Sequence, residues 1–383
     1  MTITAPAGFR AAGITAGIKS SGGKDLALVV NDGPSKVAAG VFTANRVHAA
    51  PVKWSRQVLS DGQLTAVVLN SGGANACTGP RGFQDTHATA EKVAEALGVG
   101  AVEVAVCSTG LIGEYLPMDA VLTGVERAAG ELSASGGEAA AEAIMTTDTK
   151  PKNTTRTGEG WTIGGIAKGA GMLAPGLATM LVVLTTDARI TAGLADEALR
   201  EACRLSFDRL DSDGAMSTND TVLLLSSGAS DVEPGAEDFT AALTAACQDL
   251  AGQLLSDAEG STKDVAIEVV NAADEDDAVI VGRSVARNNL VKTALFGKDP
   301  NWGRILAAVG TTDAAFDADE LDVAINGVWI CKAGAAAEDR SLVDMEPREI
   351  TITVDLKAGA ASATILTNDL SHAYVHENSA YSS

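Results

Sequence analysis

Residues that support several common kinds of binding site are scarce in this chain of 383 residues. Aromatic residues make up 4% of the sequence, and 28 basic residues stand against 50 acidic ones, which gives a net charge of −22. Single-stranded nucleic acid is bound by aromatic stacking platforms and basic grooves, and an acidic surface repels phosphate backbones. The composition therefore argues against nucleic acid as a partner.

Cysteine and histidine are too few and too scattered to predict a disulfide framework or a metal site. The five cysteines contain no CxxC pair, and an odd number of distant cysteines is typical of a reducing compartment. His372 and His376 are four residues apart, but the glutamate of the HExxH zinc motif is missing and no third ligand is evident. We therefore expect no metal.

Long apolar segments are also missing. No apolar run approaches the ~18 residues that a membrane helix needs. The N-terminus lacks the basic segment followed by an apolar segment that marks a signal peptide. We expect a cytoplasmic protein that does not contact the membrane.

Glycine is abundant, with 40 residues, but it forms no nucleotide-binding loop. Lys168 precedes Gly169, whereas a phosphate-binding loop needs Gly-Lys-Ser/Thr at the start of a helix. Gly169 and Gly171 lead into a proline and an apolar run, whereas a dinucleotide fingerprint opens a helix. We expect neither ATP nor NAD at these positions.

Short apolar runs bounded by glycine, proline and polar residues alternate with helical patterns along the chain. We expect strands at 26–30, 37–42, 65–69, 102–107, 180–184, 221–225, 265–270, 321–325 and 350–354, the first two in a hairpin-like arrangement. We expect helices at 85–97, 118–129, 137–145, 195–207, 238–256, 290–296 and 301–309. The alternation predicts an α/β (α+β) fold. The acidic run 274–277 is either the boundary of a smaller C-terminal unit or a solvated charged segment.

The stretch 168–184 contains a threonine in a position that suggests chemistry. Pro175-Gly176 predicts a turn, after which Ala178 and Thr179 lead straight into an apolar strand. A threonine freed as a new N-terminus by self-cleavage carries its own general base, because its α-amino group has a pKa near ~8. Threonine is also common at strand ends without any function. The local pattern leaves both interpretations open.

Motifs along nearly the whole chain resemble the ornithine acetyltransferase family, also called the bifunctional glutamate N-acetyltransferases of arginine biosynthesis. KGAGMLAPGLATMLVVLTTDA, which begins at Lys168, is similar to the self-cleaving motif of that family. Further similar segments are NSGGANACTG (70–79), STGLIG (108–113), AIMTTDT (143–149), STNDT (217–221), DAEGSTK (257–263), KTALFGKDPNWGR (292–304) and ENSAYSS (377–383). The family usually has Asn or Asp and then Met before Ala-Thr, where this chain has Gly176-Leu177. We still expect cleavage, because the turn and the Ala-Thr pair are kept.

The resemblance implies a fold of the DmpA and ornithine acetyltransferase type, a layered sandwich of β-sheets flanked by helices. It implies cleavage between Ala178 and Thr179, which gives an α chain (1–178) and a β chain. The β chain would contain a core part (179–275) and a smaller C-terminal domain (276–383) whose tail returns to the active site. The family also suggests an α2β2 heterotetramer.

The resemblance further assigns roles to individual residues. Thr179 would be the nucleophile, and Thr109 with Gly110 would form the oxyanion hole. The substrate contacts would be made by Thr146, Lys168, Thr179, Glu259, Asn378 and Ser383. A lysine suits a substrate carboxylate, and a glutamate suits an amine. Without the family, Ser-Thr-Gly at a strand end reads as a turn, and Glu259 as one exposed acid among 50.

The implied reaction is ping-pong transfer of the acetyl group from N2-acetyl-L-ornithine to L-glutamate through an ester of Thr179. It needs no metal or organic cofactor, and acetyl-CoA would be an alternative donor in a bifunctional enzyme. Two other functions stay open. One is a self-cleaving aminopeptidase or amidase, in which water accepts the acyl group. The other is a non-catalytic binding or storage protein, in which Thr179 is only a strand residue.

Overall fold

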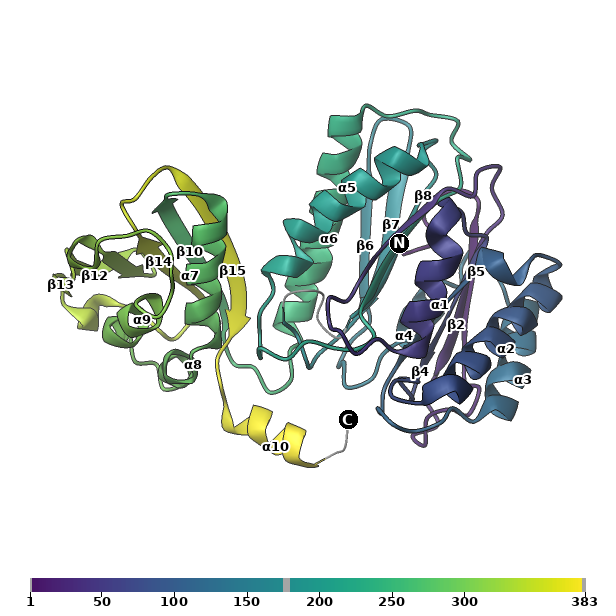
Figure 1. The fold of residues 1–383 in the computed structure, drawn as a ribbon, viewed down its shortest axis with the longest axis horizontal. Helices are drawn as coiled ribbons and strands as arrows, with labels where there is room; N and C mark the ends of the chain where they lie inside the picture. The colour runs from purple at the N-terminus through teal and green to yellow at the C-terminus, as the bar shows by residue number, and fades with distance from the viewer. Residues whose placement is uncertain (1, 175–179, 381–383) are drawn as a thin grey trace.

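The computed structural model describes residues 2–174 and 180–380, in which three sheets form a larger and a smaller unit (Figure 1). The larger unit contains the first two sheets. The first has the strand order β1-β2-β4-β5, with β1 (Phe9–Ile14), β2 (Leu26–Asn31), β4 (Ala66–Ser71) and β5 (Val104–Thr109). Neighbouring strands are antiparallel except β4 and β5, which are parallel. The carboxyl ends of β4 and β5 therefore meet at one edge of this sheet.

The second sheet has the order β3-β9-β8-β7-β6. Its strands are β3 (Ala38–Phe42), β9 (Thr221–Ser226), β8 (Leu181–Thr186), β7 (Thr162–Lys168) and β6 (Lys152–Thr157). β8 and β9 are parallel, and the other pairs are antiparallel. The hairpin expected from 26–42 is wrong, because β2 pairs with β1 and β4 whereas β3 pairs with β9 in this sheet. Local turn signals cannot show that the chain changes sheets between two strands.

The two sheets pack face to face, and β8 is buried on both sides. Leu181 and Val183 join the hydrophobic core of the first sheet. Val182 and Leu184 point the other way, into a core shared with the helices that cover the second sheet. Alternate side chains of a strand point to opposite faces, so a strand buried on both faces is mainly apolar and lacks the usual alternation with polar residues. The unbroken apolar run of β8 follows from its central position.

Helices cover both outer faces of the larger unit. α1 (Ala50–Val58), α2 (Gly79–Leu97), α3 (Met118–Gly130) and α4 (Gly137–Ala143) contribute buried residues to the core of the first sheet. α5 (Ala192–Arg204) and α6 (Ala236–Ser256) cover the second. In Figure 1, α5 and α6 lie on one side of the sheets, and α2 and α3 lie on the other. The predicted layered sandwich of β-sheets flanked by helices is confirmed.

The smaller unit is built on a third sheet of order β13-β12-β11-β14-β10-β15. Its strands are β10 (Asp264–Ala272), β11 (Asp322–Ile325), β12 (Val328–Lys332), β13 (Ala335–Ala336), β14 (Glu349–Asp355) and β15 (Ala361–Asn368). α7 (Glu275–Arg287), α8 (Asn289–Phe296) and α9 (Trp302–Val309) share its core. The last helix, α10 (His372–Ala380), leaves this unit after β15.

The boundary between the units lies before β10 and not at 275. β10 pairs with β14 and β15 inside the third sheet, so residues 264–272 belong to the smaller unit. The acidic run 274–277 begins α7, where the Asp274 side chain accepts a hydrogen bond from the N–H of Asp277 at 2.8 Å. Acidic residues stabilise the first turn of a helix, because its free N–H groups and dipole are positive. The run is therefore a helix start inside the smaller unit.

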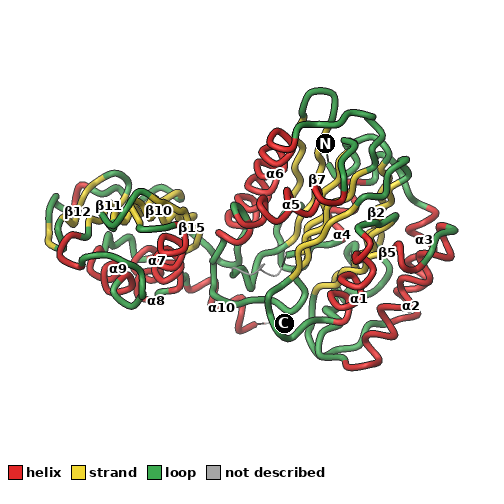
Figure 2. Tube along the Cα trace, turned by 45° about the horizontal axis from the view of Figure 1, so that its top comes forward, coloured by secondary structure: helices red, strands yellow, loops and turns green. Residues whose placement is uncertain are grey.

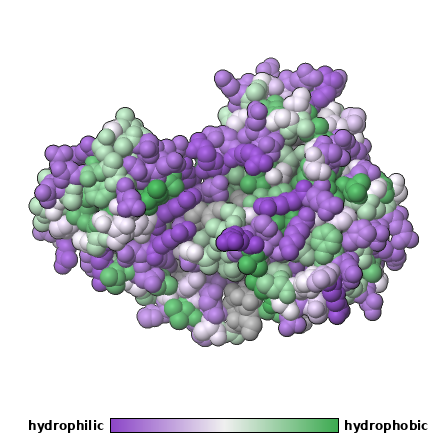
Figure 3. Space-filling model, viewed as in Figure 1, coloured by the Kyte–Doolittle hydropathy of each residue, from purple (hydrophilic) through white to green (hydrophobic). Residues whose placement is uncertain are grey.

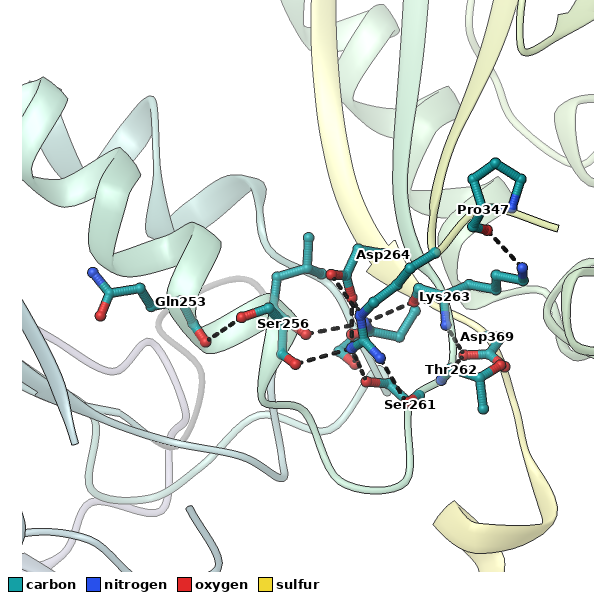
Figure 4. Close-up of polar contacts among 12 residues, drawn as sticks. Gln253, Ser256, Ser261, Thr262, Lys263, Asp264, Pro347 and Asp369 are labelled. Atoms are coloured by element: carbon teal, nitrogen blue, oxygen red, sulfur yellow. Dashed lines mark hydrogen bonds and ion pairs between the residues drawn. The ribbon is translucent and has the colours of Figure 1, made fainter. Parts of the chain in front are cut away.

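Residues 257–263 connect the two units and are held by hydrogen bonds from the smaller one (Figure 4). Asp369 accepts from the backbone N–H groups of Thr262 at 2.8 Å and Lys263 at 2.9 Å. The ammonium of Lys263 donates to the carbonyl of Pro347 at 2.6 Å. Arg348 donates to the Ser256 carbonyl, at the end of α6, and to Asp264, at the start of β10. These contacts fix the connection at both ends.

α10 returns from the smaller unit toward the larger one (Figure 2). Its start is fixed by Ser371, whose hydroxyl donates to the Gly260 carbonyl at 2.5 Å and accepts from the N–H of Tyr374 at 3.0 Å. The surface in Figure 3 is mainly hydrophilic over both units, in line with the acidic composition. Among the described residues, no helix is both long and apolar enough to cross a membrane.

Candidate active site

The carboxyl ends of β4 and β5 form a hydrogen-bonded corner. The Ser108 hydroxyl donates to Asn70 Oδ1 at 2.6 Å, and Asn70 Nδ2 donates to the Gly73 carbonyl at 3.0 Å. Asn219, just before β9, donates to the carbonyls of Ala74 at 2.6 Å and Ser108 at 2.8 Å. Buried polar side chains that satisfy backbone groups in this way hold loops in one conformation. The corner is therefore fixed to both sheets.

Gly110, which follows β5, sits where only glycine fits. Its φ is +129°, and a Cβ built on it would lie 2.5 Å from the backbone nitrogen of Gly73. The N–H groups of Gly72 and Gly73 both donate to the Thr109 carbonyl at 3.0 Å. A side chain at 110 would break this close backbone contact. The corner thus fixes Thr109 and Gly110 at one edge of a cavity.

That cavity, of about 530 Å³, brings together residues that the sequence predicted for the site. It is lined by Thr109 at the end of β5, Gly110 just after it, Thr146 after α4, Lys168 at the end of β7, Glu259 in the connection and Asn378 on α10. Ala178, Thr179 and Ser383 lie outside the described residues. The six described residues come from parts of the chain up to 269 positions apart, counted from Thr109 to Asn378. The sequence motifs therefore converge in space.

Lys168 is the buried cation of the cavity. Its ammonium donates to the hydroxyl oxygen of Thr109 at 3.3 Å, and only 1% of the residue is exposed. Burial lowers its pKa, and the nearby carboxylates of Asp148, Asp220 and Glu259 oppose that change. An ammonium has three N–H donors, so the contact with Thr109 leaves donors for a ligand.

Asp148 is a buried carboxylate that binds backbone and side-chain groups next to Lys168. Its carboxylate accepts from the N–H of Gly169 at 2.7 Å, the N–H of Thr146 at 3.0 Å and the ammonium of Lys152 at 2.6 Å. Burial would raise the pKa of Asp148, but Lys168, Lys152 and the hydrogen bonds outweigh burial and lower it to about 2. Asp148 lies within the AIMTTDT segment, yet the sequence analysis assigned it no role.

Glu259 is held on both of its oxygens. Thr147 donates to Oε1 at 2.7 Å, and Asn378 donates to Oε2 at 3.0 Å. Its own N–H donates to the Ala170 carbonyl at 2.9 Å, and a Cβ on Gly171 would lie 2.7 Å from Oε2. Only 7% of Glu259 is exposed, so it is not the exposed acid that its sequence context alone would suggest. The carboxylate is fixed in the wall of the cavity by α10 and the loop after α4.

Asp220 is a buried acid next to the start of β8. Its Oδ1 accepts from the N–H of Met180 at 3.2 Å, and the Met180 carbonyl accepts from the N–H of Thr221 at 3.2 Å. Burial raises the pKa of Asp220 well above its usual value. Asp220 therefore holds Met180, the first described residue after the gap at 175–179. Asp220 was missed, although it lies in the STNDT segment that resembles the family.

The described part of the chain offers neither a metal site nor a disulfide. No group of three or more His, Cys, Asp and Glu side chains there could hold a metal ion. All five cysteines are free thiols. What the site does offer is a lysine, a glutamate and two strand-end donors around a cavity of small-molecule size.

A layered α/β sandwich with a lysine, a glutamate and strand-end donors converging on one cavity is typical of an enzyme that binds a small molecule. The chain belongs to the ArgJ family, whose sequence profile matches residues 10–383.

Relatives cover the full length. The arginine biosynthesis bifunctional protein ArgJ of Streptomyces coelicolor is 68% identical over 383 residues, which is 100% of both chains. The protein of the same name from Mycobacterium tuberculosis H37Rv is 59% identical over 389 residues, or 100% of this chain and 96% of that protein. A solved structure of ornithine acetyltransferase from Mycobacterium tuberculosis, complexed with ornithine, is 61% identical, covers 47% of this chain and 96% of that one, and has a TM-score of 0.45.

Proposed function

We propose that this chain is a glutamate N-acetyltransferase (ornithine acetyltransferase) of arginine biosynthesis, which moves the acetyl group of N2-acetyl-L-ornithine to L-glutamate. Membership of the ArgJ family and two full-length relatives named for arginine biosynthesis support this reaction. The observation that carries the proposal is the shared cavity, in which Thr109, Gly110, Thr146, Lys168, Glu259 and Asn378 line one space. Residues brought together from five segments of the chain point to one binding site.

The nucleophile would be Thr179, freed by self-cleavage after Ala178. β7 and β8 are antiparallel neighbours, and Lys168 at the end of β7 pairs with Leu181 at the start of β8. The beginning of β8 therefore lies beside the buried lysine of the cavity. Since Met180 is bonded to Thr179, this register supports a nucleophile at the cavity edge. Cleavage would give an α chain (1–178) and a β chain (179–383).

In the first half-reaction, the Thr179 hydroxyl attacks the acetyl carbonyl and its proton passes to the Thr179 α-amino group. The carbonyl oxygen becomes an oxyanion, which would accept hydrogen bonds from the Thr109 hydroxyl and the Gly110 N–H. Because Lys168 already donates to Thr109 Oγ1, the hydroxyl proton of Thr109 is left for the oxyanion. One such donor typically contributes a factor of ~10²–10³ in rate.

Collapse of the tetrahedral intermediate breaks the bond between the acetyl carbon and the ornithine nitrogen. The α-ammonium of Thr179 returns its proton to that nitrogen, and ornithine leaves. The amine of glutamate then attacks the Thr179 ester, and the same groups act in reverse to release N-acetylglutamate and regenerate the free hydroxyl.

The charges of the cavity support the substrate assignment. Lys168 and Thr146 would bind the α-carboxylate, because a buried ammonium pairs strongly with a carboxylate. Glu259, oriented by Asn378 and Thr147, would bind the side-chain ammonium of ornithine. Ser383 would complete the substrate contacts from the C-terminal tail.

Several wider features belong to the same proposal. The reaction needs no metal or organic cofactor, and acetyl-CoA would serve as an alternative acetyl donor. The mature enzyme would be an α2β2 heterotetramer in the cytoplasm, where its five free thiols would remain reduced.

Intact mass measurement under denaturing conditions tests the proposal. After brief exposure to N2-acetyl-L-ornithine, we expect two fragments, one ending at Ala178 and one beginning at Thr179 with an added acetyl group. A single unmodified chain would contradict both the cleavage and the acetyl-threonine intermediate. Release of free acetate at the same rate with and without glutamate would instead indicate an amidase, in which water accepts the acetyl group.

A further inference from the structure

The cavity contains a second lysine, Lys19, from the loop between β1 and β2. Its ammonium donates to the backbone carbonyls of Lys24 at 2.9 Å and Met145 at 2.6 Å. Two of its three N–H groups are therefore taken by the backbone, and one remains for a ligand. Because Met145 precedes Thr146, the ammonium is fixed beside a residue of the proposed substrate site.

The loop that carries Lys19 is organised by a single buried carboxylate. Asp25, which is fully buried, accepts from the backbone N–H groups of Ala16 at 2.5 Å, Gly17 at 3.0 Å, Ile18 at 2.6 Å and Lys19 at 3.0 Å. Four such bonds hold the loop in one conformation against the cavity. They also occupy the carboxylate oxygens of Asp25 with backbone groups, so Asp25 shapes the loop without forming an ion pair with the Lys19 ammonium.

Lys19, like Lys168, forms no ion pair with a carboxylate of the described residues, whereas two neighbouring lysines do. Within residues 2–174 and 180–380, no Asp or Glu forms an ion pair with it. Lys24, in the same loop, pairs with Glu142, and Lys152 pairs with Asp148 and Asp257 at 2.6 Å each. Burial lowers the pKa of Lys19, and Lys168 lowers it further, whereas Asp25 and Asp148 oppose the change. A fixed cation without an ion-pair partner at the wall of a cavity suits an anionic group of a ligand.

The two substrates of the proposed reaction present different charged groups to the cavity. N2-Acetyl-L-ornithine has one carboxylate and a side-chain ammonium, whereas L-glutamate has two carboxylates and uses its amine as the nucleophile. Lys168 and Glu259 satisfy the first substrate. The second carboxylate of glutamate needs another cation, because Glu259 would repel it.

We propose that Lys19 binds the side-chain carboxylate of glutamate in the second half-reaction and so selects the acceptor. This assignment rests on the proposed function. In it, Lys19 does not take part in forming acetyl-Thr179, so it is a specificity residue for one half of the ping-pong cycle. Asp25 acts indirectly, by holding the loop that presents Lys19.

Separate assays of the two half-reactions test this assignment. Lys19→Gln removes the charge but keeps an amide donor for the two backbone carbonyls, and Lys19→Arg keeps the charge. Lys24→Gln is the matched control, because it removes a charge from the same loop at a side chain that does not line the cavity. Acetyl-enzyme formation is followed by intact mass after mixing with N2-acetyl-L-ornithine, and steady-state transfer is measured with glutamate and with glutamine as acceptors.

We expect Lys19→Gln to raise KM for glutamate at least ~10-fold, the loss expected for one charge-assisted hydrogen bond. Acetyl-enzyme formation should change less than ~2-fold, and the preference for glutamate over glutamine should fall by a similar ~10-fold. Lys19→Arg should restore most of the preference, and Lys24→Gln should behave as wild type. Thermal unfolding of each variant checks that it is folded, and Lys19→Met serves as a second neutral variant if the Gln variant is not.

Two results would overturn the assignment while leaving the proposed function intact. One is an unchanged glutamate KM in a folded neutral variant. The other is an equal loss in both half-reactions, which would indicate a general structural role of the loop. A wild-type chain that forms no acetyl-enzyme would instead overturn the proposed function, and the assignment of Lys19 with it.

Discussion

The ammonium of Lys168 lies 3.3 Å from the hydroxyl oxygen of Thr109, and this contact joins the end of β7 in the second sheet to the end of β5 in the first. The same lysine thus orients a proposed oxyanion-hole residue and lines the proposed substrate site. One side chain would serve both binding and chemistry.

Lys168→Met should therefore lower kcat as well as raise KM for N2-acetyl-L-ornithine. Loss of one buried charged hydrogen bond corresponds to roughly 1.5–3 kcal/mol, or about 10- to 100-fold, in kcat/KM. Steady-state kinetics measures the effect. Lys298→Met is the control, because Lys298 is half-exposed, pairs with Glu346 and lies in the smaller unit. Unchanged kinetics in Lys168→Met would remove this residue from the site.

Thr179→Ala should abolish both processing and transfer, because one hydroxyl is proposed to act in both. Intact mass should show a single uncut chain, and the transfer rate should fall to background. An uncut variant that remains fully active would refute the terminal-threonine mechanism.

Gly110→Ala should be far more damaging than Gly113→Ala, although both glycines have positive φ and lie in one loop. A Cβ at 110 meets the Gly73 nitrogen at 2.5 Å, whereas a Cβ at 113 has no atom within 4 Å among the described residues. Strain from positive φ alone costs about 1–2 kcal/mol. We expect a small loss of stability at 113, and at 110 a larger loss together with a fall in kcat. Thermal unfolding and transfer assays would show this, and similar behaviour of the two variants would contradict a steric origin.

Asp213 should make stability depend on pH. Burial raises its pKa to about 6, although hydrogen bonds from Ala215 and Met172 favour the charged form. The folded chain therefore binds the proton more tightly than the unfolded chain, whose Asp has a pKa near ~3.9. The contribution of Asp213 to the free energy of unfolding is complete below pH ~4 and is lost as pH rises through about 6.

Asp213→Asn mimics the neutral acid and should remove that loss. Its melting temperature relative to wild type should rise between pH 4 and 7 and then level off. Over this pH range, the free energy of unfolding of the variant should rise relative to that of the wild type by roughly 2–3 kcal/mol. Asp344→Asn, at an exposed acid of the smaller unit, is the control for the loss of one carboxylate. A constant difference across this pH range would contradict the raised pKa.

Local sequence was sufficient for most single elements. The expected helix at 118–129 is α3 at Met118–Gly130, and the expected strand at 221–225 is β9 at Thr221–Ser226. Both have strong apolar periodicity and clear boundaries. β15 was missed, because its polar residues, such as Thr364, hide the period-two pattern. α10 was missed because it buries no apolar face.

The site was predictable only where a segment resembled a known family. Thr109, Lys168 and Glu259 were found in this way, and they share a cavity. Asp25 and Lys19 lie outside every matching segment. The importance of Asp25 comes from four backbone N–H groups that the fold arranges around it, and no residue pattern encodes such an arrangement.

The order of the second sheet has a consequence for the proposed cleavage. β8 and β9 would belong to the β chain, and β3, β7 and β6 to the α chain, so the two β-chain strands lie between α-chain strands on both sides. Each product alone would contain only part of the second sheet. The strand edges that this leaves unpaired are paired by strands of the other product. Cutting one peptide bond would therefore release a chain end without releasing a fragment. The two products should leave a native column as one particle and separate only when the sheet itself is denatured.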